Sequence, residues 1–331
     1  MDIYSQKTRE QLISICKERK MKGYSSMKKD DIIQMLSVEP ERKVVSVSSV
    51  KPETKPDTIR FIDLFCGIGS FHYSFKKLGW ECVMSCDIDN AVKETYKTNY
   101  GIVPLGDITE IEPKQVPTYD ILCAGFPCQP FSQCGQHKGF EDKRGTLFFH
   151  IMKFVDFHKP KVIVLENVQG LLNHDGGKTF ERIKTDITSA GYELAYKVIK
   201  CSDYGLPQMR KRLIMVGVRD GKEMDKLLDF EEYKQERTLS ELLGKPFEKK
   251  VAYTIRCGGR NSPINDKHNW DGYWVNGEEY RLTKEDCLNL QGFEDFTLTG
   301  TQSEQWRQLG NTIPTRFTEI IGLNLKKHLF R

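Results

Sequence analysis

The chain has 331 residues, of which 38% are hydrophobic and 29% are charged. This composition excludes a wholly disordered chain, and the length suits about two domains or one large domain with an appendage. The net charge is +4, but residues 1–58 hold 12 basic and 9 acidic residues, so the rest is nearly neutral. No run approaches the ~18 apolar residues of a membrane helix and no secretory signal begins the chain, so we expect a soluble intracellular protein without a membrane partner.

Ten cysteines are spread along the chain without a Cys-x-x-Cys pair. Zinc fingers need closely paired ligands, so we expect no metal site. In a reducing compartment most of these thiols would be small buried side chains. One or two would carry chemistry, and their neighbours decide which.

Residues 1–38 are predicted to form a small helical unit. Thr8 and Gln11 fit a capping box, and apolar residues follow at helical spacing in two stripes. Basic residues crowd the turn between them, so the unit resembles a SAP-type DNA-binding module. A helical hairpin whose basic residues simply face water is the alternative. Residues 39–58, rich in Ser, Pro and charge, predict a flexible linker.

From residue 59 onward, short apolar runs alternate with amphipathic stretches. Strands are predicted over residues 60–65, 81–86, 121–124, 162–165, 196–199 and 213–218. Helices are predicted over residues 70–78, 91–99, 147–157 and 178–190, and again over 283–290 and 315–328. This order favours an α/β fold with a doubly wound, mostly parallel sheet. Residues 219–280 differ in character, being charged, aromatic and Gly-bearing.

The first predicted strand runs into a Gly-x-Gly turn, Gly67 to Gly69, after Phe65. Glycines there let a ligand approach the backbone and leave helix amides free for an anion or carboxylate. Asp87 ends the second strand about 20 residues later, where such folds bind ribose hydroxyls, and Asp107 offers a carboxylate to an adenine amino group. We therefore expect a nucleoside-bearing cofactor. The third glycine of the dinucleotide fingerprint is absent, which disfavours NAD.

Candidate catalytic residues follow later strands. Cys128 stands in a loop just beyond a strand, where an open α/β sheet binds ligands, and a thiolate can add to an electron-poor ring carbon. Glu166 and Asn167 end another apolar strand. Arg210 and Arg212 precede a further one and share a side if that segment is extended. Taken singly, each also fits a structural role: a buried thiol, a capping carboxylate, or solvated cations.

Four blocks occur in the order and spacing of the C5-cytosine DNA methyltransferases, which the chain resembles. They are Gly125-Phe126-Pro127-Cys128-Gln129, Glu166-Asn167-Val168, Gln208-x-Arg210-x-Arg212 and Gln308-Leu309-Gly310-Asn311-Thr312-Ile313-Pro314. Residues 61–69, 120–129, 138–149 and 281–285 are also similar to the small restriction–modification members of bacteria. The resemblance covers residues 59–331, and several ordered blocks exclude coincidence.

The resemblance implies a reaction on a cytosine flipped out of duplex DNA. Cys128 would add to C6, so that C5 takes the methyl group of S-adenosylmethionine, and a base would then remove the C5 proton as Cys128 leaves. Glu166 would hydrogen-bond or protonate N3. Arg212 would neutralise the O2 side, Arg210 would support the pocket or the Cys128 loop, and Asn167 would position the ring or the loop.

The cofactor residues implied are Phe65, Gly67 and Gly69 at the methionine end, Asp87 at the ribose, Asp107 at the adenine amino group, and Asn311. Many relatives carry Glu where this chain has the shorter Asp87. Residues 129–146, including Ser132 and Gln136, would form the closing loop that contacts DNA. Between residues 219 and 280, Arg256 and Arg260 would contact either base edges or phosphates.

The predicted organisation has five parts: a helical module (1–38), a linker (39–58), a catalytic domain (59–218), a target-recognition region (219–280), and a segment completing the catalytic domain (281–331). We expect a monomeric DNA (cytosine-5-)-methyltransferase with duplex DNA and a cognate restriction endonuclease as partners. Its place would be the cytoplasm or nucleoid, or a nucleus if a eukaryotic virus encodes it. Methylation of a tRNA cytosine and a catalytically silent DNA-binding homologue are the alternatives.

Overall fold

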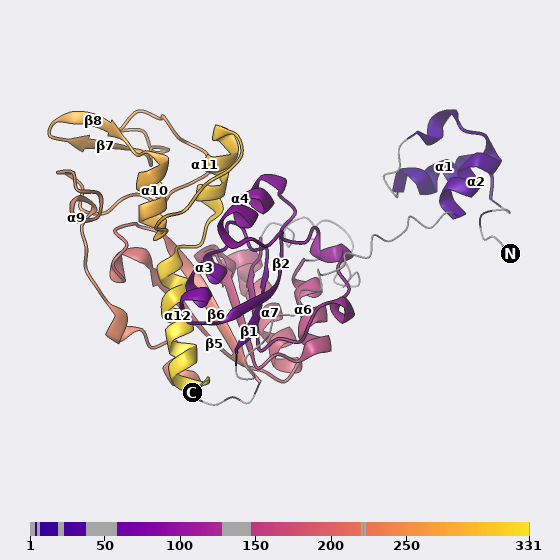
Figure 1. Ribbon diagram of the computed structural model, residues 1–331, viewed down its shortest axis with the longest axis horizontal. Helices are drawn as coiled ribbons and strands as arrows, with labels where there is room; N and C mark the ends of the chain where they lie inside the picture. Colours follow the sequence, from indigo (N-terminus) through magenta and orange to yellow (C-terminus); the bar gives the residue numbers. More distant parts are fainter. Residues whose placement is uncertain are drawn as a thin grey trace. The chain divides into compact units, whose positions relative to one another are not determined.

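The computed structural model describes residues 4, 7–18, 23–37, 58–127, 147–219, 221 and 223–330. The chain divides into two compact units, Met1–Val50 and Lys51–Arg331, which are treated separately (Figure 1). The predictions for Cys128, Ser132, Gln136 and the loop 129–146 lie outside the described residues, as does the linker up to residue 57.

The N-terminal unit contains α1 (Arg9–Glu18), the 3-10 turn η1 (Tyr24–Ser26) and α2 (Lys29–Ser37). The predicted capping box is confirmed, because Thr8 N donates to Gln11 Oε1 at 2.9 Å and Gln11 N donates to Thr8 Oγ1 at 3.3 Å. The unit has its own small core, made of Tyr4, Leu12, Cys16, Ile32 and Leu36. The predicted helical stripes therefore pack against each other.

The main unit is built on a six-stranded sheet with the order β2-β1-β3-β4-β6-β5. The strands are β1 (Arg60–Leu64), β2 (Glu81–Cys86), β3 (Ile121–Gly125), β4 (Val162–Asn167), β5 (Glu193–Lys200) and β6 (Lys211–Val218). β1 pairs in parallel with β2 and β3, and β3 with β4, whereas β6 runs antiparallel to β4 and β5. The predicted mostly parallel sheet is confirmed, with β6 as its reversed strand.

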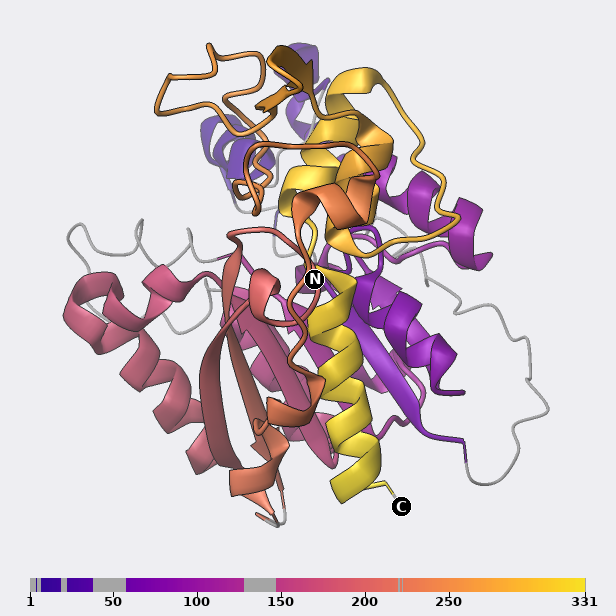
Figure 2. The same cartoon turned by 90° about the vertical axis from the view of Figure 1, so that its left-hand side faces the viewer.

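Helices cover both faces of this sheet. They are α3 (Ser70–Lys77), α4 (Asn90–Tyr100), α6 (Leu147–His158), α7 (Lys178–Ser189) and α12 (Thr315–His328). Apolar residues of α6 and α7 pack on one face, and those of α3 and α12 on the other, where α12 lies along the sheet (Figure 2). Short 3-10 turns join the elements: η2 (Ile108–Glu110), η3 (Pro113–Gln115), η4 (Gln169–Gly177), η5 (Cys201–Asp203) and η6 (Glu231–Tyr233).

The remaining elements build a second lobe, at the upper left of Figure 1. They are α9 (Leu239–Leu243), β7 (Gly272–Val275), β8 (Glu278–Arg281), α10 (Lys284–Gln291) and α11 (Gln302–Asn311). These elements share a hydrophobic core whose buried residues include Leu239, Trp270 and Leu309. The segment around α8 (Met224–Leu227) instead contributes Leu227 and Phe230 to the core beneath α12. The elements of the lobe span residues 239–311, and the predicted target-recognition region, 219–280, overlaps the first part of that span.

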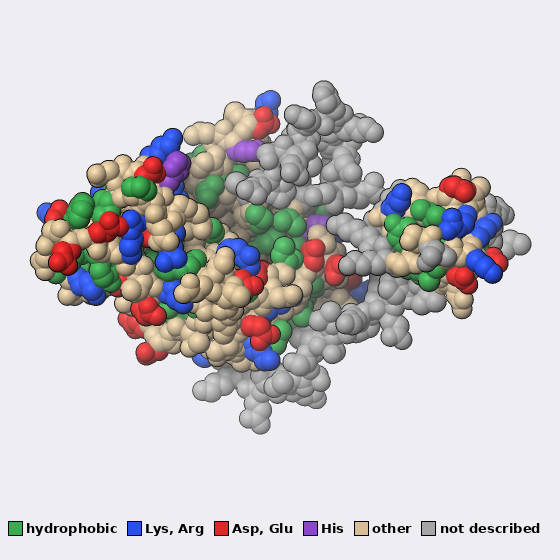
Figure 3. All heavy atoms as spheres, turned by 90° about the horizontal axis from the view of Figure 1, so that it is seen from above, with side chains coloured by type: hydrophobic (Ala, Val, Ile, Leu, Met, Phe, Trp, Pro, Cys, Tyr) green, Lys and Arg blue, Asp and Glu red, His purple; other side chains and the backbone are tan. Residues whose placement is uncertain are grey.

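Charge is mixed on the surface of the main unit. Lys, Arg, Asp and Glu side chains are interspersed on the face seen in Figure 3. Within the described ranges, no helix combines the length and the apolar character needed to cross a membrane. Of the described cysteines, Cys257 is exposed and the others are buried, as expected for most of them.

Candidate active site

A cavity of about 860 Å³ opens where β1, β2, β3 and β4 end. Parallel strands bring their carboxyl ends to one edge, so residues far apart in the sequence meet there. The last residues of α11 supply part of the opposite wall. The predicted site residues that line the cavity are Phe65, Gly67, Asp87, Asp107, Glu166, Asn167, Arg210, Arg212 and Asn311.

The turn after β1 has an unusual backbone. Phe65, Gly67 and Gly69 have φ of +55°, +52° and +89°, a region that a bulky aromatic residue rarely adopts and that is often found at functional sites. A Cβ on Gly67 would meet no atom within 4 Å, so this glycine leaves open space for a ligand. Gly69 does not line the cavity: a Cβ there would lie 2.5 Å from the Tyr100 ring, so helix packing requires this glycine.

Two carboxylates face the cavity beside this turn. Asp87 Oδ2 accepts from Gly67 N at 3.0 Å and Oδ1 accepts from Asp89 N at 2.9 Å, which fixes the side chain against the turn. Burial raises the pKa of Asp87, although these two backbone donors oppose the shift. Asp107 Oδ1 accepts from Thr109 N at 2.9 Å. Both carboxylates keep lone pairs for further donors, such as hydroxyl or amino groups of a ligand.

Glu166 and Arg212 meet at the same edge because β6 is reversed. Glu166 lies near the end of β4, and the antiparallel register places the start of β6 beside it. Arg212 Nε lies 2.7 Å from Glu166 Oε1, and both side chains are largely buried. Burial raises the pKa of Glu166, while the charges of Arg212 and then Arg210 lower it. The net effect is a raised pKa for a carboxyl that lines the cavity.

Arg210 and Asn167 hold neighbouring segments in place. Arg210 is buried and donates to Ile255 O at 3.0 Å and to Gly310 O at 3.1 Å, so it joins β6 to the second lobe. Asn167 Nδ2 donates to Phe126 O at 2.8 Å. Phe126 and Pro127 line the cavity and immediately precede Cys128 in the chain. Both contacts suit the supporting roles expected for these residues.

The two candidate DNA-contacting arginines lie in the second lobe and do not line this cavity. Arg256 Nη2 donates to His268 O, and Arg256 lines a separate hollow of about 660 Å³. Arg260 lies over the ring of Trp306, with 4.2 Å from Cζ to the ring centroid. The side chains of both arginines thus lie outside the cavity, although the backbone at Arg256 packs against Gly310, which lines it.

Several cavity residues were absent from the sequence prediction. Ile88 lines the cavity and is 72% exposed, so an apolar side chain is available to a ligand beside Asp87. Arg307 Nη2 lies 2.7 Å from Asp89 Oδ2, linking α11 to the segment after β2. Their adjacency in the sequence to Asp87 and to the Gln308 block was the available signal.

Comparison with known proteins identifies the family. Residues 59–279 match the family model described as C-5 cytosine-specific DNA methylase. The type II methyltransferase M.DsaV of Dactylococcopsis salina is 34% identical over 304 residues, covering 82% of this chain and 87% of that protein. The type II methyltransferase M.HhaI of Haemophilus parahaemolyticus is 32% identical over 311 residues, covering 82% of this chain and 95% of that protein.

Solved structures share the fold. The Dnmt2 methyltransferase of S. pombe superposes with a TM-score of 0.64 at 19% identity, covering 81% of this chain and 99% of that one. A putative DNA modification methyltransferase encoded within an E. coli prophage gives a TM-score of 0.63 at 18% identity, covering 83% and 100%. With its ordered sequence blocks, its cavity and these relatives, the chain belongs to the C-5 cytosine-specific DNA methylase family.

Proposed function

We propose that the protein methylates C5 of a cytosine at a specific duplex DNA site, with S-adenosylmethionine as methyl donor and a transient Cys128–C6 bond. The observation that carries this proposal is the Glu166–Arg212 pair, 2.7 Å apart, in the same cavity as Asp87, Asp107 and Asn311. One cavity thus offers both a proton-exchanging carboxyl with a cation and a polar surface for a nucleoside.

The residues present fit S-adenosylmethionine. The volume of the cavity is within the range of about 300–1,000 Å³ usual for small-molecule sites. The open space above Gly67 leaves room for the amino-acid end of the cofactor. Asp87 would accept from ribose hydroxyls and Asp107 from the adenine amino group, with Ile88 against the adenine face. When bound, this cofactor supplies an electrophilic methyl group.

The chain's own residues would activate the cytosine. The Cys128 thiolate forms a bond to C6, and negative charge moves toward N3 and O2. Glu166 donates a proton or hydrogen bond to N3, and Arg212 stabilises the O2 side. After C5 has taken the methyl group, a base removes the C5 proton, the C6–S bond breaks and the thiolate is restored.

Trapping of the covalent intermediate tests this function. With a duplex that carries 5-fluorocytosine, the C5 proton is missing, so elimination is blocked and the protein remains attached to DNA. We expect a cofactor-dependent adduct that peptide mapping assigns to Cys128, and no adduct with Cys128→Ser. Label transfer from S-adenosylmethionine to ordinary DNA, with a tRNA pool as a second substrate, completes the assay. Transfer to tRNA alone, or no adduct, would overturn the proposal.

The proposal includes a monomeric enzyme and a restriction endonuclease that cuts the same site. The endonuclease, but not the monomeric state, is supported by the relatives, which are named type II methyltransferases. A plasmid methylated by this protein should then resist that endonuclease.

We further propose that the N-terminal unit binds duplex DNA as an accessory module. Its two helices share a separate core, and Lys17 and Lys28 are exposed. Each phosphate contact contributes about 0.9 to the slope of log affinity against log salt. A variant lacking residues 1–57 should therefore have a shallower salt dependence with unchanged chemistry, and Lys17→Gln/Lys28→Gln should go part of the way. Equal slopes for full-length and truncated protein would contradict this role.

A further inference from the structure

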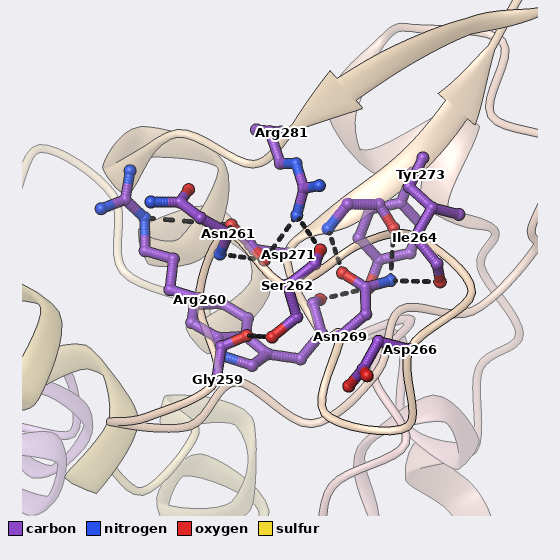
Figure 4. A network of polar contacts seen from close by, with 12 residues as sticks. Gly259, Arg260, Asn261, Ser262, Ile264, Asp266, Asn269, Asp271, Tyr273 and Arg281 are labelled. Carbon is purple, nitrogen blue, oxygen red and sulfur yellow. Dashed lines mark hydrogen bonds and ion pairs between the residues drawn. The ribbon is translucent and has the colours of Figure 1, made fainter.

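The loop between Arg256 and Asp271 contains no helix or strand, yet polar contacts fix its shape (Figure 4). The buried Asp271 carboxylate accepts from Asn261 N at 3.1 Å and from Arg281 Nη1 at 3.2 Å. Asn269 Nδ2 donates to Ile264 O at 3.1 Å. A loop whose shape is fixed by its own hydrogen bonds loses little further conformational freedom when it binds a partner.

Two side chains, Trp306 and Asp271, hold Arg260 in place. Its Cζ lies 4.2 Å from the centroid of the Trp306 ring, and its Nε lies 3.9 Å from Asp271 Oδ2. Trp306, on α11, is itself fixed by the edge-on contact with Trp270 at 6.1 Å between ring centroids. The Arg260 guanidinium therefore lies over the Trp306 ring and within ion-pair distance of the Asp271 carboxylate.

The terminal nitrogens of Arg260 remain available. No hydrogen bond or ion pair with another described residue engages either Nη atom, and Figure 4 shows them directed away from the loop. Arg256 differs, because its Nη2 is committed to the His268 carbonyl. The backbone before Arg260 is also constrained: a Cβ on Gly259 would lie 2.6 Å from His268 O.

We propose that Arg260 reads a guanine in the target site, and that Trp306 and Asp271 are positioning residues that present its fork to the major groove. This inference rests on the proposed function. Two parallel N–H groups match the O6 and N7 acceptors of guanine, whereas a single ammonium cannot reproduce that geometry. Arg256, whose Nη2 donates to the His268 carbonyl, stabilises the loop instead. At most one side of its guanidinium remains for a phosphate.

The test measures site choice together with activity. A randomised duplex pool is methylated by the unaltered protein, and bisulfite sequencing defines the preferred site. Arg260→Lys should lower the preference for guanine at one position of that site by about 10- to 100-fold, with cofactor binding unchanged. Arg182→Lys, on α7, is the matched control and should leave the site unaltered. If Arg260→Lys weakens methylation of all sequences equally, Arg260 contacts only phosphate and the inference fails.

The positioning roles have a separate readout. Trp306→Leu and Asp271→Asn should reduce discrimination at the same position, and Trp306→Phe, which keeps an aromatic face, should restore most of it. In an Arg260→Ala background, Trp306→Leu should change discrimination no further, whatever it does to thermal stability. An equal loss with and without Arg260 would refute the positioning role. If the unaltered protein methylates no DNA, the proposed function fails; if it does and the variants keep its site, only this inference fails.

Discussion

The carboxyl of Glu166 and the guanidinium of Arg212 lie 2.7 Å apart, although 46 positions separate them in the numbering. Glu166 lies near the end of β4, and Arg212 lies near the start of the antiparallel strand β6. Removing either partner leaves the other charged and partly desolvated. The pair is therefore the most sensitive point of the site.

Glu166→Gln should slow methyl transfer by about 10²- to 10⁴-fold, the usual contribution of a positioned acid. The amide can still hydrogen-bond to N3 but cannot supply a proton. Binding of S-adenosylhomocysteine, measured by calorimetry, should not change. Glu181→Gln, on the exposed surface of α7, is the control. A slowdown of less than threefold would remove Glu166 from the chemistry.

The pH dependence should follow the protonation of Glu166. Burial raises the pKa of this carboxyl, so the protonated form persists above pH 4.5 and the single-turnover rate falls as pH rises through the shifted value. Arg212 lowers that pKa, so Arg212→Gln should move the falling limb to higher pH, even though the rate itself drops. A limb that stays in place or moves to lower pH would contradict the coupling.

Asn167 should act through the loop that carries Cys128. Asn167→Asp keeps the acceptor for Val168 N but loses the donor to Phe126 O, which the structure places 2.8 Å away. The loss of one buried hydrogen bond costs about 0.5–1.5 kcal/mol. We expect a lower kcat with little change in cofactor affinity, and a similar defect in Asn167→Ala. Wild-type kcat in both variants would exclude this role.

The Arg307–Asp89 pair should support cofactor binding. Asp89→Asn keeps the side-chain oxygen that caps α4 through Ala91 N but removes the charge. Exposed pairs are worth about 0.2–1 kcal/mol, so this change or Arg307→Gln should weaken S-adenosylhomocysteine binding by about 1.5- to 5-fold. In the double variant the two losses should not add. Full additivity would show that the ion pair has no effect on the cavity.

His72 should contribute to acid sensitivity. It lies 2.8 Å from the Tyr96 hydroxyl and stacks on Tyr100, and burial, then the Lys76 charge, lower its pKa from 6.5 to about 4. Between these values the unfolded chain binds more protons, so stability falls as pH drops, by about 3 kcal/mol through this group. His72→Gln should flatten the dependence of unfolding free energy on pH, whereas the exposed His268→Gln should not. Parallel curves for His72→Gln and wild type would contradict this.

The sequence predicts most of the sheet, because β1, β3, β4 and β6 are short, largely buried apolar runs. The edge strand β5 is partly exposed, and only its second half is predicted. The sequence does not predict the direction of β6, since an apolar run carries no information about its orientation, and the Glu166–Arg212 contact depends on that direction. α11 is also missed: its sequence is largely polar, and its buried face comes from Trp306, Gln308 and Leu309. The β7–β8 hairpin had a usable signal in Asn276-Gly277, whose positive φ values fit a tight turn.

For the site too, some features could be predicted from the sequence and others could not. Ordered sequence blocks predict which residues line the cavity. The carboxyl ends of β1 to β4 fix the place of most of them, whereas Arg210 and Arg212 reach the cavity from the start of β6 and Asn311 from the end of α11. The Arg260–Trp306 cation–π contact and the Arg307–Asp89 pair join segments far apart in the sequence. Only the folded packing of α11 brings them together.

Bisulfite sequencing of DNA from cells that express the protein shows directly whether it methylates cytosine at a specific site. We predict protected cytosines at one recurring sequence, none in cells that express Cys128→Ser, and fewer in cells that express Glu166→Gln at the same level. Unprotected cytosines throughout the DNA of cells that express the unaltered protein would contradict the account.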